Sequence, residues 1–405
     1  MADPRPPFAA LGDKTPEAVF GGLPTPCYVI DEGALLHNAE ILKRVQDDTG
    51  CRILLAQKAF SNYDLYGLLA PYLAGTEASG LFEARLGCEE MPGKETHVFC
   101  GAYRDEEFPE LLEYADHVVF NSVGQLKKFG PAAKNAGKSV GLRVNPECST
   151  QEGHAIYDPC APGSRLGVTR AQFDAGMTPD LLSLLDGLHF HTLCEQNADD
   201  LKTTLDAVAD RFGDVLSGMK WLNFGGGHHI TRPDYDIGLL ESCIRFAQNE
   251  WGVTVYLEPG EAVALNAGFL CARVLDVTVN GQVTNVILDA SAACHMPDVI
   301  EMPYVPPLYG APAGESAGSG VTCRLGGPTC LAGDVIGDYV FDKPPREGDL
   351  LVFGDMAIYT TCKNNTFNGM PLPDIYARKT DGGFVKLTAF GYGDFKQRLG
   401  SPKRP

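Results

Sequence analysis

The sequence has no apolar run that approaches the ~20 residues needed to cross a membrane as a helix, so we expect no membrane span. Residues 1–7 lack the basic start and apolar core of a secretory signal peptide, and a cytoplasmic protein is the expectation. The 13 cysteines are odd in number, and no pair has the Cys-x-x-Cys spacing of zinc ribbons. Reduced thiols fit this pattern better than a disulfide framework.

Positive charge is also scarce. Lys and Arg number 33 against 52 Asp and Glu, which gives a formal charge of −19 at pH 7. This charge argues against nucleic-acid binding and mildly favours cationic ligands. The remaining composition, 44% hydrophobic and 21% charged, is that of a globular protein with a large core.

Strand-like apolar runs alternate with helical stretches up to about residue 260. The expected strands are 53–58, 75–79, 96–100, 117–121, 140–145, 187–192, 220–225 and 254–259. The expected helices are 62–72, 81–90, 105–114, 123–136, 165–184, 197–217 and 235–250. Eight such units predict an α/β fold, a (β/α)8 TIM barrel, with a doubly wound sheet as the alternative.

The alternation of strands and helices stops after Gly268. Short strand-like runs between Gly and Pro turns predict a second, mostly β domain, which also takes in the N-terminal strand near residues 24–31. We expect residues 1–34 to be an arm and strand joining the β domain, 35–267 to be the barrel and 268–405 to be the β domain. Residues 1–23 are expected to be irregular, and 303–320 to form a mobile loop of unknown role.

Lys58 ends the first expected barrel strand, and barrel enzymes place their chemistry at such ends. A lysine there either extends its amine into solvent or forms a Schiff base, its pKa lowered by burial. Other polar residues end later strands: Arg143 the fifth, His189 and His191 the sixth, and Glu258 the eighth.

Each of these features can also be interpreted as purely structural, without a role in binding or catalysis. Gly225, Gly226 and Gly227 form either a flexible turn or, opening a helix, a phosphate cradle of backbone N–H groups. His189 and His191 alternate on a strand, so they point the same way, either as core residues or toward a cofactor ring. Glu258 is either a solvated rim carboxylate or a buried acid. The adjacent His228 and His229 cannot readily share one ion, so no metal is expected.

Together the strand ends match the needs of pyridoxal 5'-phosphate. This cofactor needs a lysine for its imine, N–H donors for its phosphate, a flat group against its ring and a partner for its pyridine nitrogen. A carboxylate such as Glu258 keeps that nitrogen protonated and makes the ring a strong electron sink. The combination favours decarboxylation.

At this point the chain resembles the fold type III pyridoxal phosphate-dependent decarboxylases, the ornithine and diaminopimelate group. It is most similar to the carboxynorspermidine/carboxyspermidine decarboxylases, from about residue 24 to 392. The motifs that carry the resemblance are Leu-Ala-Gln-Lys-Ala-Phe (55–60), 187–195, 223–229, Glu-Pro-Gly (258–260), Gly-Pro-Thr-Cys (327–330) with the residues up to Asp334, 356–361 and 367–369.

The resemblance implies a role for each matching residue. Lys58 bonds the cofactor, His191 stacks on its ring and Glu258 pairs with its nitrogen. Gly225 to Gly227 and Tyr359 hold the phosphate. It also implies a homodimer with shared active sites, in which Cys330 arrives from the partner chain and protonates the carbanion. Arg143 and Arg165 lie near the site, and Arg165 faces Asp334 of the other chain.

Two departures from the group bear on the substrate. Glu261 stands where amino-acid decarboxylases have a phosphate-binding Arg, and Leu331 stands where diaminopimelate decarboxylases have an acid. Both fit the carboxynorspermidine branch, whose carboxylated polyamine substrate suits an acidic cleft. Glu195 is a candidate for binding a tail ammonium.

The alternatives are a decarboxylase of diaminopimelate, ornithine or arginine, a racemase, and an inactive homologue that binds a partner. The retained Lys58 and Cys330 argue against the inactive homologue, and Glu258 argues against a racemase. The sequence does not choose between carboxynorspermidine and carboxyspermidine, because the two differ by one methylene.

Overall fold

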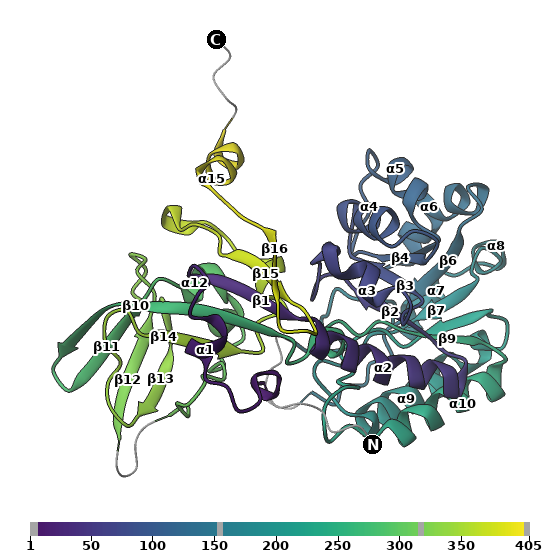
Figure 1. The fold of residues 1–405 in the computed structure, drawn as a ribbon. Helices are drawn as coiled ribbons and strands as arrows, with labels where there is room; N and C mark the ends of the chain where they lie inside the picture. Colours follow the sequence, from purple (N-terminus) through teal and green to yellow (C-terminus); the bar gives the residue numbers. More distant parts are fainter. Residues whose placement is uncertain (1–6, 152–156, 315–319, 401–405) are drawn as a thin grey trace. The chain divides into compact units, whose positions relative to one another are not determined.

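The structure is a computed structural model that describes residues 7–151, 157–314 and 320–400. The chain forms two compact units (Figure 1). Of the described residues, the first comprises 36–151 and 157–263, and the second comprises 7–35, 264–314 and 320–400.

The first unit is a closed barrel of eight parallel strands in sequence order, as predicted. Strand β9 closes it against β2, with Arg52 opposite Tyr256. The strands are β2 (Arg52–Ala56), β3 (Gly75–Ala78), β4 (Glu95–Phe99), β5 (His117–Phe120), β6 (Ser139–Arg143), β7 (Gly187–His189), β8 (Trp221–Asn223) and β9 (Thr254–Leu257).

Helices follow the strands around the barrel (Figure 1). Side-chain caps fix several of their starts: Asn197 caps α9 and Asp236 caps α10, while Gly252 ends α10 in the left-handed region with φ 69°. The helices up to β9 are α2 (Glu32–Thr49), α3 (Tyr66–Leu69), α4 (Leu81–Glu90), α5 (Phe108–Tyr114), α6 (Val123–Asn135), α7 (Arg170–Gly176), α8 (Pro179–Leu182), α9 (Ala198–Leu216) and α10 (Ile237–Trp251), with a 3-10 turn at Tyr63–Leu65.

The barrel interior is filled by large side chains from some strands that face glycines on others. Trp221 on β8 lies over Gly141 and Gly187. A Cβ at these glycines would come within 2.3 Å and 2.1 Å of its ring. Trp221 packs in one buried cluster with Leu54, Val119 and Tyr256. The interior is therefore a packed core rather than a channel.

All eight barrel strands end one to three residues earlier than expected, and in two of them this changes where site residues lie. Strand β2 ends at Ala56, so Lys58 lies in the turn beyond the strand and does not end it. Strand β7 ends at His189, so His191 lies outside the strand, and the argument that the two histidines point the same way does not hold. No Gly or Pro follows either strand directly, so the sequence did not mark where the strand ends.

The second unit is an eight-stranded sheet in the order β13-β12-β11-β10-β1-β15-β16, with β14 paired to β10. Strand β1 lies antiparallel to β10 and parallel to β15, so the N-terminal strand joins this sheet as predicted (Figure 1). The strands are β1 (Cys27–Asp31), β10 (Gly268–Asn280), β11 (Val283–Leu288), β12 (Val321–Gly326), β13 (Val335–Phe341), β14 (Leu350–Gly354), β15 (Asp374–Arg378) and β16 (Phe384–Thr388).

The expected irregular arm is wrong in part, because it contains a 3-10 turn and a helix capped by Thr15. The expected loop at 303–320 falls partly outside the described residues, which omit 315–319. No helix in the described parts of the chain is long and apolar enough to cross a membrane. The remaining helical elements are Ala9–Leu11, α1 (Pro16–Phe20), α11 (Glu261–Ala264), α12 (Ala292–His295), α13 (Asp298–Glu301), α14 (Thr360–Lys363), Phe367–Gly369 and α15 (Tyr392–Leu399).

Candidate active site

The barrel brings charged side chains together at the carboxyl ends of its strands. Lys58 follows β2, Glu77 lies on β3, Arg143 ends β6 and Glu258 follows β9. Three of the four are nearly inaccessible: Glu77, Arg143 and Glu258 are 2%, 5% and 3% exposed. Buried charges of this density in a barrel mouth are typical of catalytic sites.

Lys58 extends its amine toward two carboxylates. Its Nζ lies 3.5 Å from Oε2 of Glu77, and its side chain keeps about a third of its surface exposed (35%). Burial opposes the charged amine, but Glu77 and then Glu258 more than offset it and raise the pKa of Lys58 above its usual value. The expected lowering of this pKa by burial is therefore wrong for the amine as it stands here.

Glu77 is a site residue that the sequence analysis missed. Burial raises the pKa of its carboxyl to about 7, even though the neighbouring Lys58 amine lowers it. Its carboxylate is consequently poised to change protonation near neutral pH. An acid in the third position of the buried run Gly75–Ala78 was the available signal.

Glu258 is buried and fully engaged, so it is not a solvated rim carboxylate. Its Oε2 lies 3.0 Å from Nε2 of His189, and its Oε1 accepts a hydrogen bond from Nδ2 of Asn223 at 2.6 Å. Burial alone would raise the pKa of Glu258, but His189 and Lys58 outweigh it and lower the pKa to about 2. Glu258 therefore carries its negative charge at any working pH.

His191 is held as a neutral ring. Burial first, and then the positive charges of Lys58 and Arg143, lower the pKa of His191 well below its usual value. Its Nδ1 accepts a hydrogen bond from the N–H of Gly226 at 3.3 Å, which leaves the ring hydrogen on Nε2. Arg143 donates to the His191 carbonyl at 3.2 Å and stacks over the Phe99 ring at 4.6 Å.

The glycine triplet follows β8 and, of the two alternatives considered, does not open a helix, because α10 begins only at Ile237. Gly225 and Gly227 adopt φ of 70° and 83°, a region that disfavours other residues. A Cβ on Gly225 would lie 2.5 Å from the Phe190 carbonyl, and one on Gly227 would lie 2.1 Å from the Leu193 carbonyl. The triplet thus packs backbone against backbone beside His191, and the N–H groups of Gly225 and Gly226 donate to Asn223 Oδ1 and His191 Nδ1.

The two histidines after the triplet have separate partners. Nε2 of His228 lies 3.3 Å from the Phe224 carbonyl, and Nε2 of His229 lies 2.6 Å from Oε2 of Glu261. Glu261, which replaces the arginine of amino-acid decarboxylases, is therefore paired with a histidine inside the barrel unit. Glu195 adopts a left-handed φ of 55° and is exposed, and its carbonyl accepts from Arg232 at 3.5 Å.

Three predicted site residues belong to the second unit. Cys330 is exposed, and its N–H donates to Oδ1 of Asn368 at 2.8 Å. Tyr359 adopts a left-handed φ of 55° at the start of α14. Asp334 is buried and accepts hydrogen bonds from Thr329 Oγ1 at 2.6 Å and from both Ser291 Oγ and the Ala293 N–H. Its ion pair with Arg165 of another chain stays a prediction.

These residues fit pyridoxal phosphate on their own chemistry. Lys58 offers the amine, Glu258 a permanently ionised partner for a ring nitrogen and His191 a flat, neutral face. The glycine triplet lies beside His191, where the backbone approach is too close for any Cβ. The balance of two cations, Lys58 and Arg143, against two carboxylates leaves the site able to accept a zwitterionic ligand.

Comparison with known proteins agrees with this site. The sequence matches the family described as pyridoxal-dependent decarboxylase, C-terminal sheet domain, over residues 27–357. A carboxyaminopropylagmatine decarboxylase from Synechocystis sp. is 41% identical over 382 residues, which are 94% of this chain and 97% of that protein. A carboxynorspermidine/carboxyspermidine decarboxylase from Campylobacter jejuni is 39% identical over 92% of this chain and 98% of that protein.

Solved structures extend the agreement to the fold. The crystal structure of carboxynorspermidine decarboxylase complexed with norspermidine, from Campylobacter jejuni, superposes with a TM-score of 0.84 at 37% identity and covers 93% of this chain and 100% of that one. A diaminopimelate decarboxylase from Helicobacter pylori shares the fold at a TM-score of 0.79 and 17% identity. The resemblance inferred from the sequence is confirmed: the chain belongs to the pyridoxal phosphate-dependent decarboxylases of the ornithine and diaminopimelate group, on its carboxynorspermidine/carboxyspermidine side.

Proposed function

We propose that the protein decarboxylates carboxynorspermidine or carboxyspermidine and so forms norspermidine or spermidine in polyamine biosynthesis. The observation that carries this proposal is the near full-length similarity to the Campylobacter jejuni enzyme, whose crystal structure holds norspermidine. Leu331 and Glu261 add support, because each replaces a residue that the simpler amino-acid decarboxylases use.

The chain's own residues divide the work in the barrel mouth. Bound pyridoxal phosphate supplies a ring that withdraws the electron pair left behind when CO2 departs. Lys58 would hold the cofactor covalently, and Glu77, 3.5 Å from the Lys58 Nζ, would exchange a proton with that amine when it is free. Glu258, ionised throughout, would hold a proton at the ring nitrogen and keep the ring electron-poor. His191 would pack against the ring, and the glycine triplet would lie at the phosphate.

The second unit completes the site in this proposal. Cys330 delivers the proton that replaces CO2, and Tyr359 contributes to holding the phosphate. The protein acts as a homodimer in the cytoplasm, and each site takes Cys330 from the partner chain. Its exposed position on a loop, with the backbone fixed by Asn368, suits a residue that projects toward another chain.

A second candidate substrate is carboxyaminopropylagmatine, favoured by the 41% identical Synechocystis protein. Its tail ends in a guanidinium group, which is planar and has a fixed fork of donors, whereas the polyamine tails carry a compact ammonium. A carboxylate such as Glu195 could bind either group, so the tail contacts do not decide between them.

Side-by-side kinetics test the proposal. The purified holoenzyme is given carboxynorspermidine, carboxyspermidine, carboxyaminopropylagmatine, diaminopimelate, ornithine and arginine, and CO2 release is followed with the product mass. We expect kcat/KM for a carboxylated polyamine or its agmatine analogue to exceed that for the simple amino acids by at least ~100-fold, because unpaired polar groups in a site reject the shorter substrates. Equal or better turnover of diaminopimelate, ornithine or arginine would refute it.

A further inference from the structure

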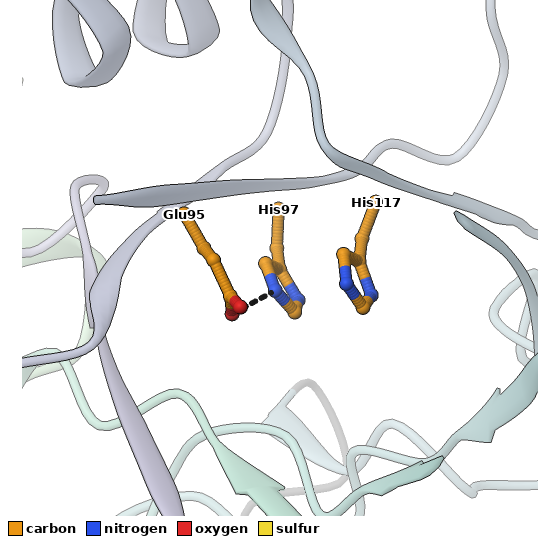
Figure 2. Close-up of side chains that lie close together, drawn as sticks. All are labelled: Glu95, His97 and His117. Atoms are coloured by element: carbon orange, nitrogen blue, oxygen red, sulfur yellow. Dashed lines mark hydrogen bonds and ion pairs between the residues drawn. The ribbon is translucent and has the colours of Figure 1, made fainter. Parts of the chain in front are cut away.

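A second polar cluster lies inside the barrel at the opposite ends of its strands. Glu95 is the first residue of β4, His97 follows two positions later on the same face, and His117 begins β5 directly opposite His97 (Figure 2). One ligand atom from each residue lies within 4.8 Å of the other two. Neither the proposed reaction nor the family comparison uses these residues.

Simple core packing does not account for the cluster. The two imidazole rings stack at 3.8 Å between centroids, yet Nδ1 of each ring is buried and has no hydrogen-bond partner among the described residues. His97 is only 1% exposed. Buried polar atoms are nearly always paired, so two orphaned ring nitrogens side by side call for a ligand.

We propose that Glu95, His97 and His117 bind a divalent transition metal ion, Zn²⁺ in the first place, which joins β4 to β5 at the base of the barrel. Two imidazoles and a carboxylate are a donor set that Zn²⁺ accepts, with a water as the fourth ligand. The expectation of no metal rested on the adjacent His228 and His229, which are not part of this site.

Arg52 lies next to the cluster and fixes the carboxylate. Its Nη2 is 2.9 Å from Oε1 of Glu95, while Oε2 of Glu95 faces His97 Nε2 at 3.2 Å. Arg52 therefore orients one carboxylate oxygen, as second-layer partners of metal ligands commonly do, and an ion would replace the contact between the other oxygen and His97. Its positive charge also moderates the affinity, and Lys94 nearby is already bonded to the Leu73 carbonyl at 2.9 Å.

A cavity on the same side reaches one residue of the cluster. A cavity of about 620 Å³ is lined by Arg52, Ala74, Gly93, Lys94, Glu95 and Asp116, so Glu95 belongs to both the cavity and the cluster. To share one ion the nearly parallel rings must turn, since each lone pair lies in its ring plane, and the ligand atoms must approach to roughly 3.3 Å. Rotation of an imidazole about its second side-chain torsion is soft.

Trp221 provides a local reporter. Its ring centroid lies 5.3 Å from that of His117, and the chain has one other tryptophan, Trp251. In a Trp251→Phe background, Co²⁺ bound at the cluster should quench Trp221 fluorescence by contact. The holoenzyme is titrated with Co²⁺, and Zn²⁺ is then added in competition.

We expect saturable quenching at one equivalent of Co²⁺, reversed by Zn²⁺. In the same background, His117→Gln should raise the half-saturating Co²⁺ concentration at least tenfold, because one of three protein ligands is lost. His37→Gln makes the same substitution on α2 and controls for the loss of a histidine. It should leave the half-saturating Co²⁺ concentration unchanged. Glu95→Gln keeps both rings and should also weaken binding, so the test survives if His117→Gln fails to fold.

A second readout excludes the thiols. Zn²⁺ should raise the midpoint of thermal unfolding of the Trp251→Phe protein and of its His37→Gln variant but not of its Glu95→Gln variant. Absence of saturable quenching would overturn the proposal. Equal Co²⁺ affinity in Glu95→Gln and His37→Gln would do the same, because the ion would then be bound at other groups such as cysteines.

Discussion

Replacing Glu258 with Gln tests the electrostatic core of the site. The substitution keeps the size of the side chain and removes a charge that the site keeps ionised, since the pKa of Glu258 is lowered to about 2. A hydrogen bond to a charged group contributes roughly 1.5–3 kcal/mol, about twice as much as a neutral one. A neutral amide cannot hold a proton at the ring nitrogen, so this contribution is lost where electrons are withdrawn.

We therefore expect kcat of Glu258→Gln to fall by about 100-fold, which corresponds to roughly 3 kcal/mol of barrier. The change should appear in kcat rather than in KM, because the interaction strengthens only as the carbanion forms. Single-turnover CO2 release, with cofactor occupancy checked by absorbance, measures it directly.

Glu261→Gln is the matched control. Glu261 lies three residues further on, and it also pairs with a histidine, His229, at 2.6 Å. It should lower kcat by no more than about threefold, a difference of well under 1 kcal/mol. If Glu258→Gln, fully loaded with cofactor, also stays within that range, the assignment of Glu258 to the ring nitrogen is wrong.

Four further outcomes are expected. Lys58→Ala should lose the covalent cofactor, seen as no mass increase after borohydride reduction, and an unchanged mass increase would place the bond on another lysine. In cofactor-free protein, the free energy of unfolding of Glu77→Gln should rise relative to that of the wild type as pH rises from about 4.5 to about 7, by up to roughly 3 kcal/mol in urea unfolding. The cause is the raised pKa of Glu77, which makes its ionisation in the folded protein costly over this range. The same difference between the two proteins at both pH values would contradict this. Glu195→Gln should raise KM for the polyamine and leave cofactor affinity alone, whereas the reverse would point to a cofactor or structural role. Mixed Lys58→Ala and Cys330→Ala chains should recover about a quarter of wild-type activity if sites are shared between subunits, and no recovery despite proven exchange would mean each site lies within one chain.

The eight barrel strands could be predicted because each is a buried parallel strand and therefore a short apolar run. The predicted runs overlap all eight observed strands, from Arg52–Ala56 to Thr254–Leu257. Their ends were less certain, since no Gly or Pro separates a strand such as Arg52–Ala56 from the turn that holds Lys58. The helices of the N-terminal arm were missed, because a five-residue helix such as Pro16–Phe20 is too short to show a helical periodicity of apolar residues.

The sequence revealed the site residues at strand ends but not those inside strands. Lys58, Arg143 and Glu258 were visible because each lies at the end of a mostly apolar run. Glu77 and His97 were not, because they lie within strands and a polar residue there is read as facing solvent. In a barrel the alternate positions face a closed interior instead, so Glu77 is 2% exposed and His97 is 1% exposed. Only the closure of the sheet reveals that these side chains meet.

The charges in the barrel mouth also argue that the site is selected for chemistry rather than stability. Each ion taken out of water costs several kcal/mol, and a well-packed apolar group of similar volume is often as stable or more so. Lys58, Arg143, Glu77 and Glu258 nevertheless occupy one end of a barrel whose middle is filled by Trp221, Leu54 and Val119. Their charges cancel in pairs, so removal of any one leaves another buried without its partner. Glu77 and Glu258 then have opposite properties beside the same lysine, one with its pKa raised to about 7 and one with its pKa lowered to about 2. Two carboxylates separated in this way can serve one as an exchangeable proton site and the other as a fixed charge, which is the division that a decarboxylase needs.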